Sequence, residues 1–319
     1  MDKAAVHWKQ AGYSVRQGFW MRQKRIVEDI SLVLNEGRVL GLVGPNGAGK
    51  TTTIKLGAGL LAPVSGEVSI RGIAAIQPKA RTKLGLLTEV QYVYPNLKLG
   101  EWLSMMGGLS GLVGPRLRER MAFVTERFAL ADKLDQYMRT LSKGQLQRAG
   151  FAQALLHDPE ILLLDEPMSG LDPFWRYRFH QIFSELRAAR KSILFSSHIL
   201  VDVERLCDDI ALVQAGRVVW QGSMAQLTRR TLGYEVVCKA QESSALLGLV
   251  SEAAIKRLPQ NEWLFTIPPD QKPELMALVV AEKITLESLR PILEDIEEIF
   301  FGDAKRYHTD NHHAILPSK

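Results

Sequence analysis

The segment from Gly44 to Thr51 has the residue types and the spacing of a loop that binds phosphate groups. It reads Gly-Pro-Asn-Gly-Ala-Gly-Lys-Thr, which completes the pattern G-x-x-x-x-G-K-T. Its glycines permit a backbone whose successive N–H groups wrap an anion, and the N-terminus of a following helix favours negative charge. We therefore expect a nucleoside triphosphate to bind here. The expected binding residues are Gly44, Pro45, Asn46, Gly47, Ala48, Gly49, Lys50, Thr51 and Thr52.

The sequence around this loop predicts the secondary structure that such a loop needs. Residues Val39–Val43 form a short apolar run that predicts a buried strand, and Thr51–Leu56 predict the start of a helix. In that context Lys50 is expected to reach the β- and γ-phosphates, and the Thr51 hydroxyl is expected to bind Mg²⁺. A chance glycine-rich turn would lack the flanking strand and helix.

Two more apolar runs end in side chains that suit the hydrolysis of a phosphate bond. Residues Ile161–Leu164 precede Asp165 and Glu166, and Ser192–Ser197 precede His198. Asp165 is expected to hold Mg²⁺, Glu166 to polarise the attacking water, and His198 to lie near the γ-phosphate. The alternatives are an acidic pair in solvent and a structural histidine, and it is the phosphate loop that favours the catalytic interpretation.

Residues Leu141–Gln145 read Leu-Ser-Lys-Gly-Gln and resemble the signature motif of ABC ATPases. With the phosphate loop, the acidic pair and His198 in this order, the first two-thirds of the chain resembles an ATP-binding subunit of an ABC transporter. Lys143 departs from the commonest signature, which has glycine at this position. The resemblance assigns two further groups of residues. They are the signature, Leu141, Ser142, Lys143, Gly144 and Gln145, and the D-loop, Ser169, Gly170, Leu171 and Asp172.

This resemblance implies a fold, a cofactor and an arrangement of two subunits. The implied fold is the α/β P-loop NTPase of the ABC ATPase type, with a mostly parallel sheet core, an antiparallel β part and an inserted helical subdomain, followed by a small α+β C-terminal domain. Two cassettes would pack head to tail, so that each ATP with its Mg²⁺ lies between Lys50 of one and Ser142 of the other. A homodimer could build two complete sites, because the chain carries one full set of motifs.

The expected domain boundaries follow changes of pattern along the chain. Residues 1–230 are expected to form the nucleotide-binding domain, within which 91–158 form the helical subdomain that carries the signature. Residues 234–306 are expected to form the small domain, with a role in dimerisation or regulation. Residues 307–319 are expected to be a flexible tail, and its three histidines are not expected to form a metal site.

Two sites match the family pattern less closely. Trp20 is expected to stack on the adenine, with Tyr13 and Phe19 as competitors, because stacking uses the face of an aromatic ring. Glu89 stands where the family usually has a glutamine that contacts Mg²⁺, and Gln91 follows two residues later. A glutamate can still bind the ion through an oxygen, but it adds negative charge beside the phosphates.

Local patterns predict several elements around the motifs. Asp172 and Pro173 predict the cap and the first residue of a helix, and residues 210–213 and 218–220 predict a hairpin. The stretch 92–102 is expected either to dock a membrane partner or to form a satellite core. Its candidate residues are Tyr92, Tyr94, Leu97 and Trp102.

The pattern changes after Gly233. Residues 234–237 and 263–267 alternate in the manner of strands, and two adjacent prolines end the second of them. Residues 273–282 and 286–301 are expected to be helices.

Composition and charge limit the classes of partner. The chain has 319 residues, of which 46% are hydrophobic and 24% charged, and its net charge is +5. No compact basic block with interleaved aromatics occurs, so no nucleic acid is expected as a partner. Cys207 and Cys238 lack the spacing of metal ligands. Because no apolar run approaches the ~18 residues of a spanning helix and no signal peptide is recognisable, we expect any pore to come from a polytopic permease encoded separately.

The leading hypothesis is an ATP-hydrolysing subunit that powers a membrane ABC transporter of the export type. It would bind peripherally, through its permease, at the cytoplasmic face of the inner membrane. The alternative is a non-transport ABC ATPase that acts on ribosomes or DNA. Such relatives usually carry two cassettes or a long coiled coil, whereas this chain shows one cassette and no sustained heptads. The transported substrate is not encoded in any of these motifs.

Overall fold

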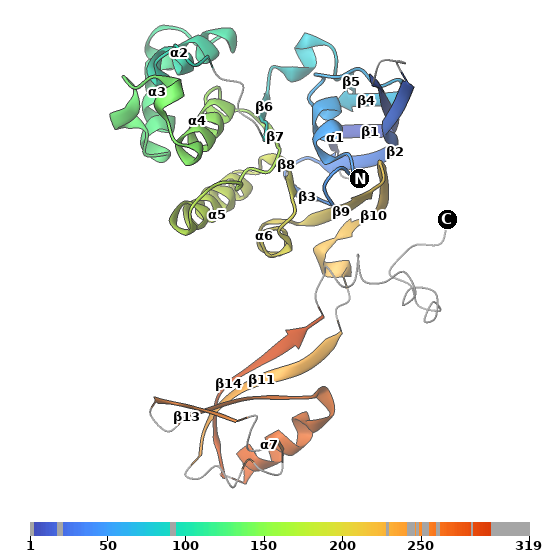
Figure 1. Ribbon diagram of the computed structural model, residues 1–319, viewed down its shortest axis with the longest axis vertical. Helices are drawn as coiled ribbons and strands as arrows, with labels where there is room; N and C mark the ends of the chain where they lie inside the picture. Colours follow the sequence, from blue (N-terminus) through green and yellow to red (C-terminus); the bar gives the residue numbers. More distant parts are fainter. Residues whose placement is uncertain are drawn as a thin grey trace. The chain divides into compact units, whose positions relative to one another are not determined.

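A computed structural model of the chain (Figure 1) describes residues 3–17, 22–89, 94–227, 230–240, 246, 249–250, 255–259, 262–281 and 283–294. Contacts divide the chain into two compact units, Met1–Gln226 and Leu227–Lys319. Each unit has its own sheet and its own hydrophobic core.

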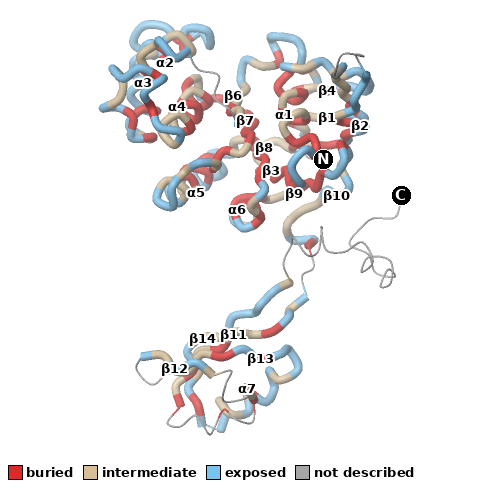
Figure 2. The backbone as a smooth tube through the Cα atoms, viewed as in Figure 1, coloured by how far each residue is buried: buried red, intermediate tan, exposed pale blue. Residues whose placement is uncertain are grey.

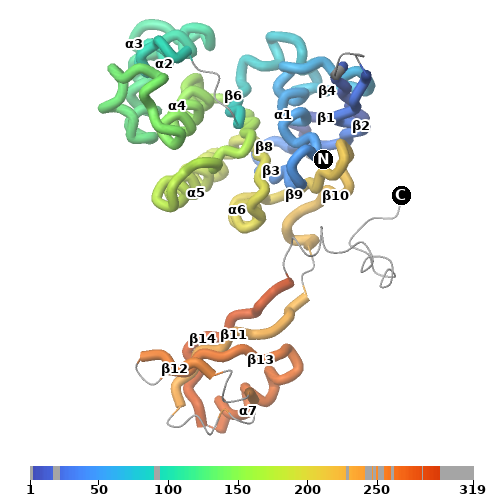
Figure 3. The backbone as a smooth tube through the Cα atoms, viewed as in Figure 1, coloured from blue at the N-terminus to red at the C-terminus, as the bar shows by residue number. Residues whose placement is uncertain are grey.

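Strands of the first unit form one sheet with parallel and antiparallel parts. They are β1 (Ala4–Gln17), β2 (Arg22–Asn35), β3 (Val39–Val43), β4 (Ser65–Ile70), β5 (Ile73–Ala74), β6 (Leu84–Leu87), β7 (Ile161–Leu164), β8 (Ser192–Ser197), β9 (Asp209–Gln214) and β10 (Arg217–Ser223). Their order is β5-β4-β1-β2-β10-β9-β3-β8-β7-β6. The strands from β9 to β6 pair in parallel, whereas β5, β4, β1 and β2 pair antiparallel. Colouring by sequence shows β10 beside β2, which is distant in the chain (Figure 3).

Helices of the first unit cover this sheet or extend from it. They are α1 (Lys50–Gly57), α2 (Leu99–Leu109), α3 (Gly114–Arg127), α4 (Lys143–Leu155), α5 (Pro173–Ala188) and α6 (Leu200–Leu206). The predicted helix start is confirmed, because Asp172 Oδ1 accepts a 2.8 Å hydrogen bond from the N–H of Trp175 at the head of α5. The predicted hairpin is confirmed as β9 and β10. Among the described residues, no helix combines the length and the apolar character needed to cross a membrane.

The parallel part of the sheet positions the residues that are expected to bind the phosphates and the metal ion. All residues of β3, β7 and β8 are buried (Figure 2), as expected for parallel strands covered on both faces. Parallel strands end at the same edge of a sheet, where ligands of such folds bind. β3 leads into Gly44, β6 is followed by Glu89, β7 by Asp165 and β8 by His198. The sheet therefore brings four distant sequence positions to one edge.

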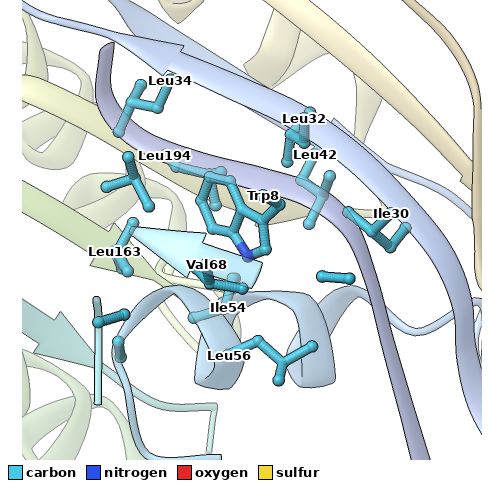
Figure 4. Packing of buried hydrophobic residues seen from close by; sticks show 14 of the residues in the cluster. Trp8, Ile30, Leu32, Leu34, Leu42, Ile54, Leu56, Val68, Leu163 and Leu194 are labelled. Atoms are coloured by element: carbon cyan, nitrogen blue, oxygen red, sulfur yellow. The ribbon is translucent and has the colours of Figure 1, made fainter. Parts of the chain in front are cut away.

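A buried tryptophan fixes the helix that follows the phosphate loop. Trp8 is fully buried on β1, and its indole N–H donates a 3.0 Å hydrogen bond to the carbonyl of Thr53 in α1. Leu42, Leu163 and Leu194 from the parallel strands belong to the same core cluster (Figure 4). Both parts of the sheet thus share one core with α1.

A second packed group holds α4 against α5 and the sheet. The Phe151 ring of α4 lies 4.6 Å from the Phe179 ring of α5 and 5.3 Å from the Phe128 ring, measured between centroids. The Phe183 ring of α5 lies 6.1 Å from the Phe151 ring and 5.3 Å from the Phe195 ring of β8. All five rings are buried, so the signature helix is packed against the elements that carry the site.

In the described part of the second unit, an antiparallel sheet packs against helix α7. Its elements are β11 (Thr231–Lys239), β12 (Lys256–Leu258), β13 (Glu262–Ile267), α7 (Lys272–Val280) and β14 (Thr285–Leu293). The strand order is β12-β13-β11-β14. Val236, Phe265 and Leu275 are buried in its core.

The helix expected over residues 286–301 is wrong for the part that the structure describes. Residues Thr285–Leu293 form β14, an edge strand that pairs with β11. Leu286 and Leu289 are three residues apart, a spacing typical of a helix face, but a register shift in β14 places them opposite Cys238 and Val236. A β-bulge of this kind lets two residues of odd spacing face one core. Residues 295–301 lie outside the described part.

The aromatic group around α4 generates a stability prediction. Phe151→Ala is expected to lower the free energy of unfolding of the first unit by about 3–5 kcal/mol, because it leaves a cavity among three rings. Phe174→Ala on α5, whose side chain is 65% exposed, is the matched control and should change it by less than about 1 kcal/mol. Urea titration followed by tryptophan fluorescence measures both. Equal losses would contradict the assigned packing.

Candidate functional site

The phosphate loop has the backbone that the sequence predicted. A Cβ on Gly44 would lie 2.2 Å from the carbonyl oxygen of Val213, so no larger residue fits this close approach. Gly49 has a φ of +105°, in the left-handed region that favours glycine, and no side chain caps the N-terminus of α1 that follows it. The first turn of α1 therefore presents N–H groups for an anion.

Lys50 lies across this loop. Its side chain is buried, and its Nζ donates hydrogen bonds to the carbonyl oxygens of Gly44 at 2.7 Å and Pro45 at 3.3 Å. An ammonium group has three donors, so one remains for a phosphate oxygen. The loop thus holds the cation in place before any ligand binds.

Asp165 has one satisfied and one unsatisfied carboxylate oxygen. It is 1% exposed, and its Oδ1 accepts a 2.6 Å hydrogen bond from Ser196 Oγ. Its Oδ2 is buried and has no hydrogen-bond partner in the described part of the chain. Thr51 and Asp165 both line the cavity that is described below. A carboxylate oxygen and a hydroxyl fit Mg²⁺, which usually takes one or two carboxylates and completes its shell with water and substrate phosphates.

Among the described residues, no three His, Cys, Asp or Glu side chains converge on one point. A metal cage made by the protein alone is therefore not present in that part of the chain. Glu89 follows β6, lines the cavity and is exposed, so its carboxylate can turn toward or away from an ion.

Glu166 and His198 form a pair at the edge of the site. His198 Nδ1 and Glu166 Oε2 lie 2.8 Å apart, joined by a hydrogen bond. Burial raises the pKa of Glu166, while the nearby His198 and Lys50 partly oppose that rise. Glu166 also has a φ of +48°, an uncommon backbone conformation for a residue with a side chain. Such strained positions are often functional.

These groups surround one cavity of about 740 Å³, a size suited to a nucleotide. It brings together residues of the phosphate loop, both carboxylates and His198, along with Glu89 and Ser169. The lining residues are Lys24, Arg25, Ile26, Glu28, Asn46, Gly47, Gly49, Lys50, Thr51, Thr52, Glu89, Asp165, Glu166, Ser169, His198 and Ala215.

The signature residues do not line this cavity. Leu141 is buried, and Ser142 caps α4 by a reciprocal pair of hydrogen bonds with Gln145. The Lys143 side chain lies against Gly170, where an added Cβ would be 2.9 Å from Lys143 Cε. The signature and the D-loop therefore touch within one subunit, outside its own nucleotide cavity.

The D-loop residues differ in whether they line a cavity. Ser169 lines both the large cavity and a neighbouring cavity of about 190 Å³, and Gly170 and Leu171 line only the smaller one, which Glu166 and His198 also border. Asp172 caps α5 and does not reach either cavity.

Three aromatic residues were expected as candidates to stack on the adenine. Trp20 and Phe19 lie outside the described residues. Tyr13 pairs with Val27 on β2, packs against the core and does not line the cavity. Residues 24–26 of β2 line it instead, and no role was expected for these residues.

The stretch expected either to dock a partner or to form a satellite core contains both buried and exposed side chains. Trp102 is 3% exposed because it lies on the apolar face of α2 with Leu99 and Leu103, so it belongs to the core. Tyr94 is 59% exposed. Tyr92 lies outside the described residues.

Two polar residues that contact the segment 165–167 were not predicted from the sequence. Ser196 binds both Asp165 and the N–H of Glu166. Gln147 of α4 is 5% exposed, and its Nε2 donates to the carbonyl oxygens of Pro167 at 2.9 Å and Glu166 at 3.3 Å. Polar side chains within otherwise buried elements were the available signal, because such groups need partners.

Comparison with known proteins agrees with this site. The sequence profile of the ABC transporter family matches residues 27–169. The chain is 36% identical to an uncharacterised ABC transporter ATP-binding protein of Nostoc sp., over 95% of this chain and 91% of that protein. It is 32% identical to the Nod factor export ATP-binding protein I of Ralstonia nicotianae, over 80% of this chain and 81% of that protein.

Solved structures show the same fold. A structure of the ATP-binding subunit of an ABC transporter superposes with a TM-score of 0.62 at 30% identity, over 69% of this chain and 90% of that one. A dimeric bacterial ABC transporter cassette superposes with a TM-score of 0.63 at 22% identity, over 69% of this chain and 98% of that one. Since the similarity to the Nostoc protein extends over nearly the whole length, the chain belongs to the ATP-binding subunits of ABC transporters and is an ATPase of that family.

Proposed function

We propose that this ATPase powers export through a membrane permease supplied by a separate polytopic chain. The observation that carries the proposal is the single cavity in which Lys50, Asp165, Glu166 and His198 meet. The export direction is supported by the Nod factor export protein among the relatives. The protein would act at the cytoplasmic face of the inner membrane, bound through its permease, and the exposed Tyr94 is a candidate contact.

The proposed mechanism is attack of a water molecule on the γ-phosphate of ATP. Lys50 and the N–H groups of the phosphate loop bind the phosphates and stabilise the charge that develops on them. Glu166 accepts the proton of the attacking water, and His198 orients Glu166 through their hydrogen bond while contacting the γ-phosphate. Asp165 and Thr51 would hold Mg²⁺, which neutralises phosphate oxygens when bound.

We also propose that two copies pair head to tail around ATP. The signature residues Ser142 to Gln145 stand at the N-terminus of α4 and do not line the cavity of their own subunit. A helix N-terminus favours an anion, so this end of α4 suits the γ-phosphate held by another subunit. ATP would then join the two copies, and its hydrolysis would loosen them.

The first test replaces the proposed base. Glu166→Gln is expected to keep ATP binding and to lower kcat by about 10²–10⁴-fold, because the amide cannot accept the proton. With hydrolysis blocked, the variant should accumulate with ATP as a dimer in size-exclusion chromatography. Glu119→Gln, at an exposed position of α3, is the matched control and should hydrolyse ATP normally. Near-normal turnover of Glu166→Gln would reject the assignment.

The same variant tests the partner. Tagged Glu166→Gln protein, purified with ATP from solubilised membranes of its own host, is expected to bring down a polytopic membrane protein. Ribosomal proteins or a DNA-bound partner without any membrane chain would favour a non-transport role instead.

The raised pKa of Glu166 generates a pH prediction. A general base works when deprotonated, so kcat should fall as pH is lowered through the pKa of Glu166, with a midpoint above the ordinary value of 4.5. His198→Ala removes a neighbour that lowers this pKa, so the midpoint should move to higher pH even though the rate itself drops. Profiles of kcat at saturating ATP measure the midpoint. A midpoint that stays fixed or moves to lower pH in His198→Ala would contradict the role of the pair.

A further inference from the structure

A single hydroxyl joins the two carboxylic residues of the site. Ser196 lies on β8 and is fully buried. Its Oγ donates to Asp165 Oδ1 at 2.6 Å and accepts from the backbone N–H of Glu166 at 2.8 Å. A serine hydroxyl has one proton to donate, and here that proton is committed to Asp165, because the other partner is itself a donor.

The bond to Ser196 determines which oxygen of Asp165 remains for a ligand. With Oδ1 engaged, the carboxylate plane is fixed and Oδ2 is left as the buried oxygen without a partner among the described residues. A buried, unsatisfied carboxylate oxygen is costly, and a cation is its natural partner. The hydroxyl therefore selects and orients the oxygen that can bind a metal ion.

The hydrogen bond between the Glu166 N–H and Ser196 holds the backbone that carries the second carboxylate. Glu166 holds a φ of +48°, which surrounding contacts must maintain. Its N–H is fixed by Ser196, and its carbonyl oxygen accepts from Ser169 N–H at 3.0 Å and from Gln147. Ser196 thus acts on the side chain of one residue and on the backbone of the next.

We infer that Ser196 is a positioning residue that sets the affinity of the site for Mg²⁺ and keeps the Glu166 carboxylate in register with it. This inference rests on the proposed function of Asp165 as a metal ligand. Hydrogen bonds that orient a metal ligand are typically worth about 10–100-fold in metal affinity. Loss of the hydroxyl should therefore weaken the binding of nucleotide with metal, but not that of nucleotide alone.

The test measures how far Mg²⁺ strengthens nucleotide binding. Calorimetry gives the dissociation constant of the non-hydrolysable analogue AMP-PNP with Mg²⁺ and with EDTA, and the ratio of the two constants reports the coupling between metal and nucleotide. Ser196→Ala is expected to reduce this ratio by about 10–100-fold, with the affinity in EDTA unchanged. The readout is binding, so it does not depend on turnover.

Ser192→Ala is the matched control. Ser192 is 2% exposed and lies at the other end of the same strand, β8. Its substitution by alanine likewise removes a hydrogen bond from a backbone N–H, that of Gly37 at 2.9 Å. It should keep the wild-type ratio. Ser196→Thr retains the hydroxyl and should restore most of the ratio, which a purely structural loss would not allow. If Ser196→Ala does not fold, Ser196→Cys, with its weaker donor, should show a reduced ratio.

Each outcome bears on a separate claim. An unchanged ratio in Ser196→Ala, or equal losses with and without Mg²⁺, would overturn the inference about Ser196. Wild-type protein that binds the analogue in EDTA but gains nothing from Mg²⁺ would instead reject the proposed metal role of Asp165.

Discussion

The site depends on a carboxyl group that is buried at the end of an apolar strand. Asp165 is 1% exposed, and all four residues of the strand before it are buried. Burying a polar group is costly unless it finds hydrogen-bond partners. In this fold one partner comes from the neighbouring parallel strand, since β8 supplies Ser196. On the other side of β8, β3 leads into the loop whose Lys50 and Thr51 line the same cavity as Asp165. The strand order is therefore a condition for the chemistry as well as for the core.

A second constraint joins α4, which begins at the signature, to the backbone of Glu166 and Pro167. Gln147 holds the carbonyl groups of Glu166 and Pro167, and Lys143 lies against Gly170. The buried phenylalanine rings lock α4 onto α5 and β8. In the proposed dimer, α4 would meet the ATP bound by the other subunit. Within its own subunit, α4 is hydrogen-bonded to the backbone of Glu166, the proposed base. The lysine that departs from the usual signature takes part in this contact through the length of its side chain.

Much of this arrangement could be predicted from the sequence, because the strongest signals were local. The phosphate loop, the buried strands before Asp165 and His198, and the cap at Asp172 each depend on neighbouring residues only. Predictions failed where the structure of a segment, or the role of a residue, depends on residues that are distant in the sequence. β14 has the apolar spacing of a helix, and its pairing with β11 through a bulge overrides that spacing. Ser196 looks like any serine in a strand until the fold places it between Asp165 and Glu166.

The most direct test of the account mixes two defective proteins. Lys50→Ala should lack a working phosphate loop and Ser142→Arg a working signature, so each alone should hydrolyse ATP very slowly. In a mixed dimer, the phosphate loop of the Ser142→Arg copy faces the intact signature of the Lys50→Ala copy, and one complete site forms. The account predicts that ATPase activity returns on mixing and is greatest near equal amounts. No recovery, or full activity of Ser142→Arg alone, would contradict a site shared between two subunits.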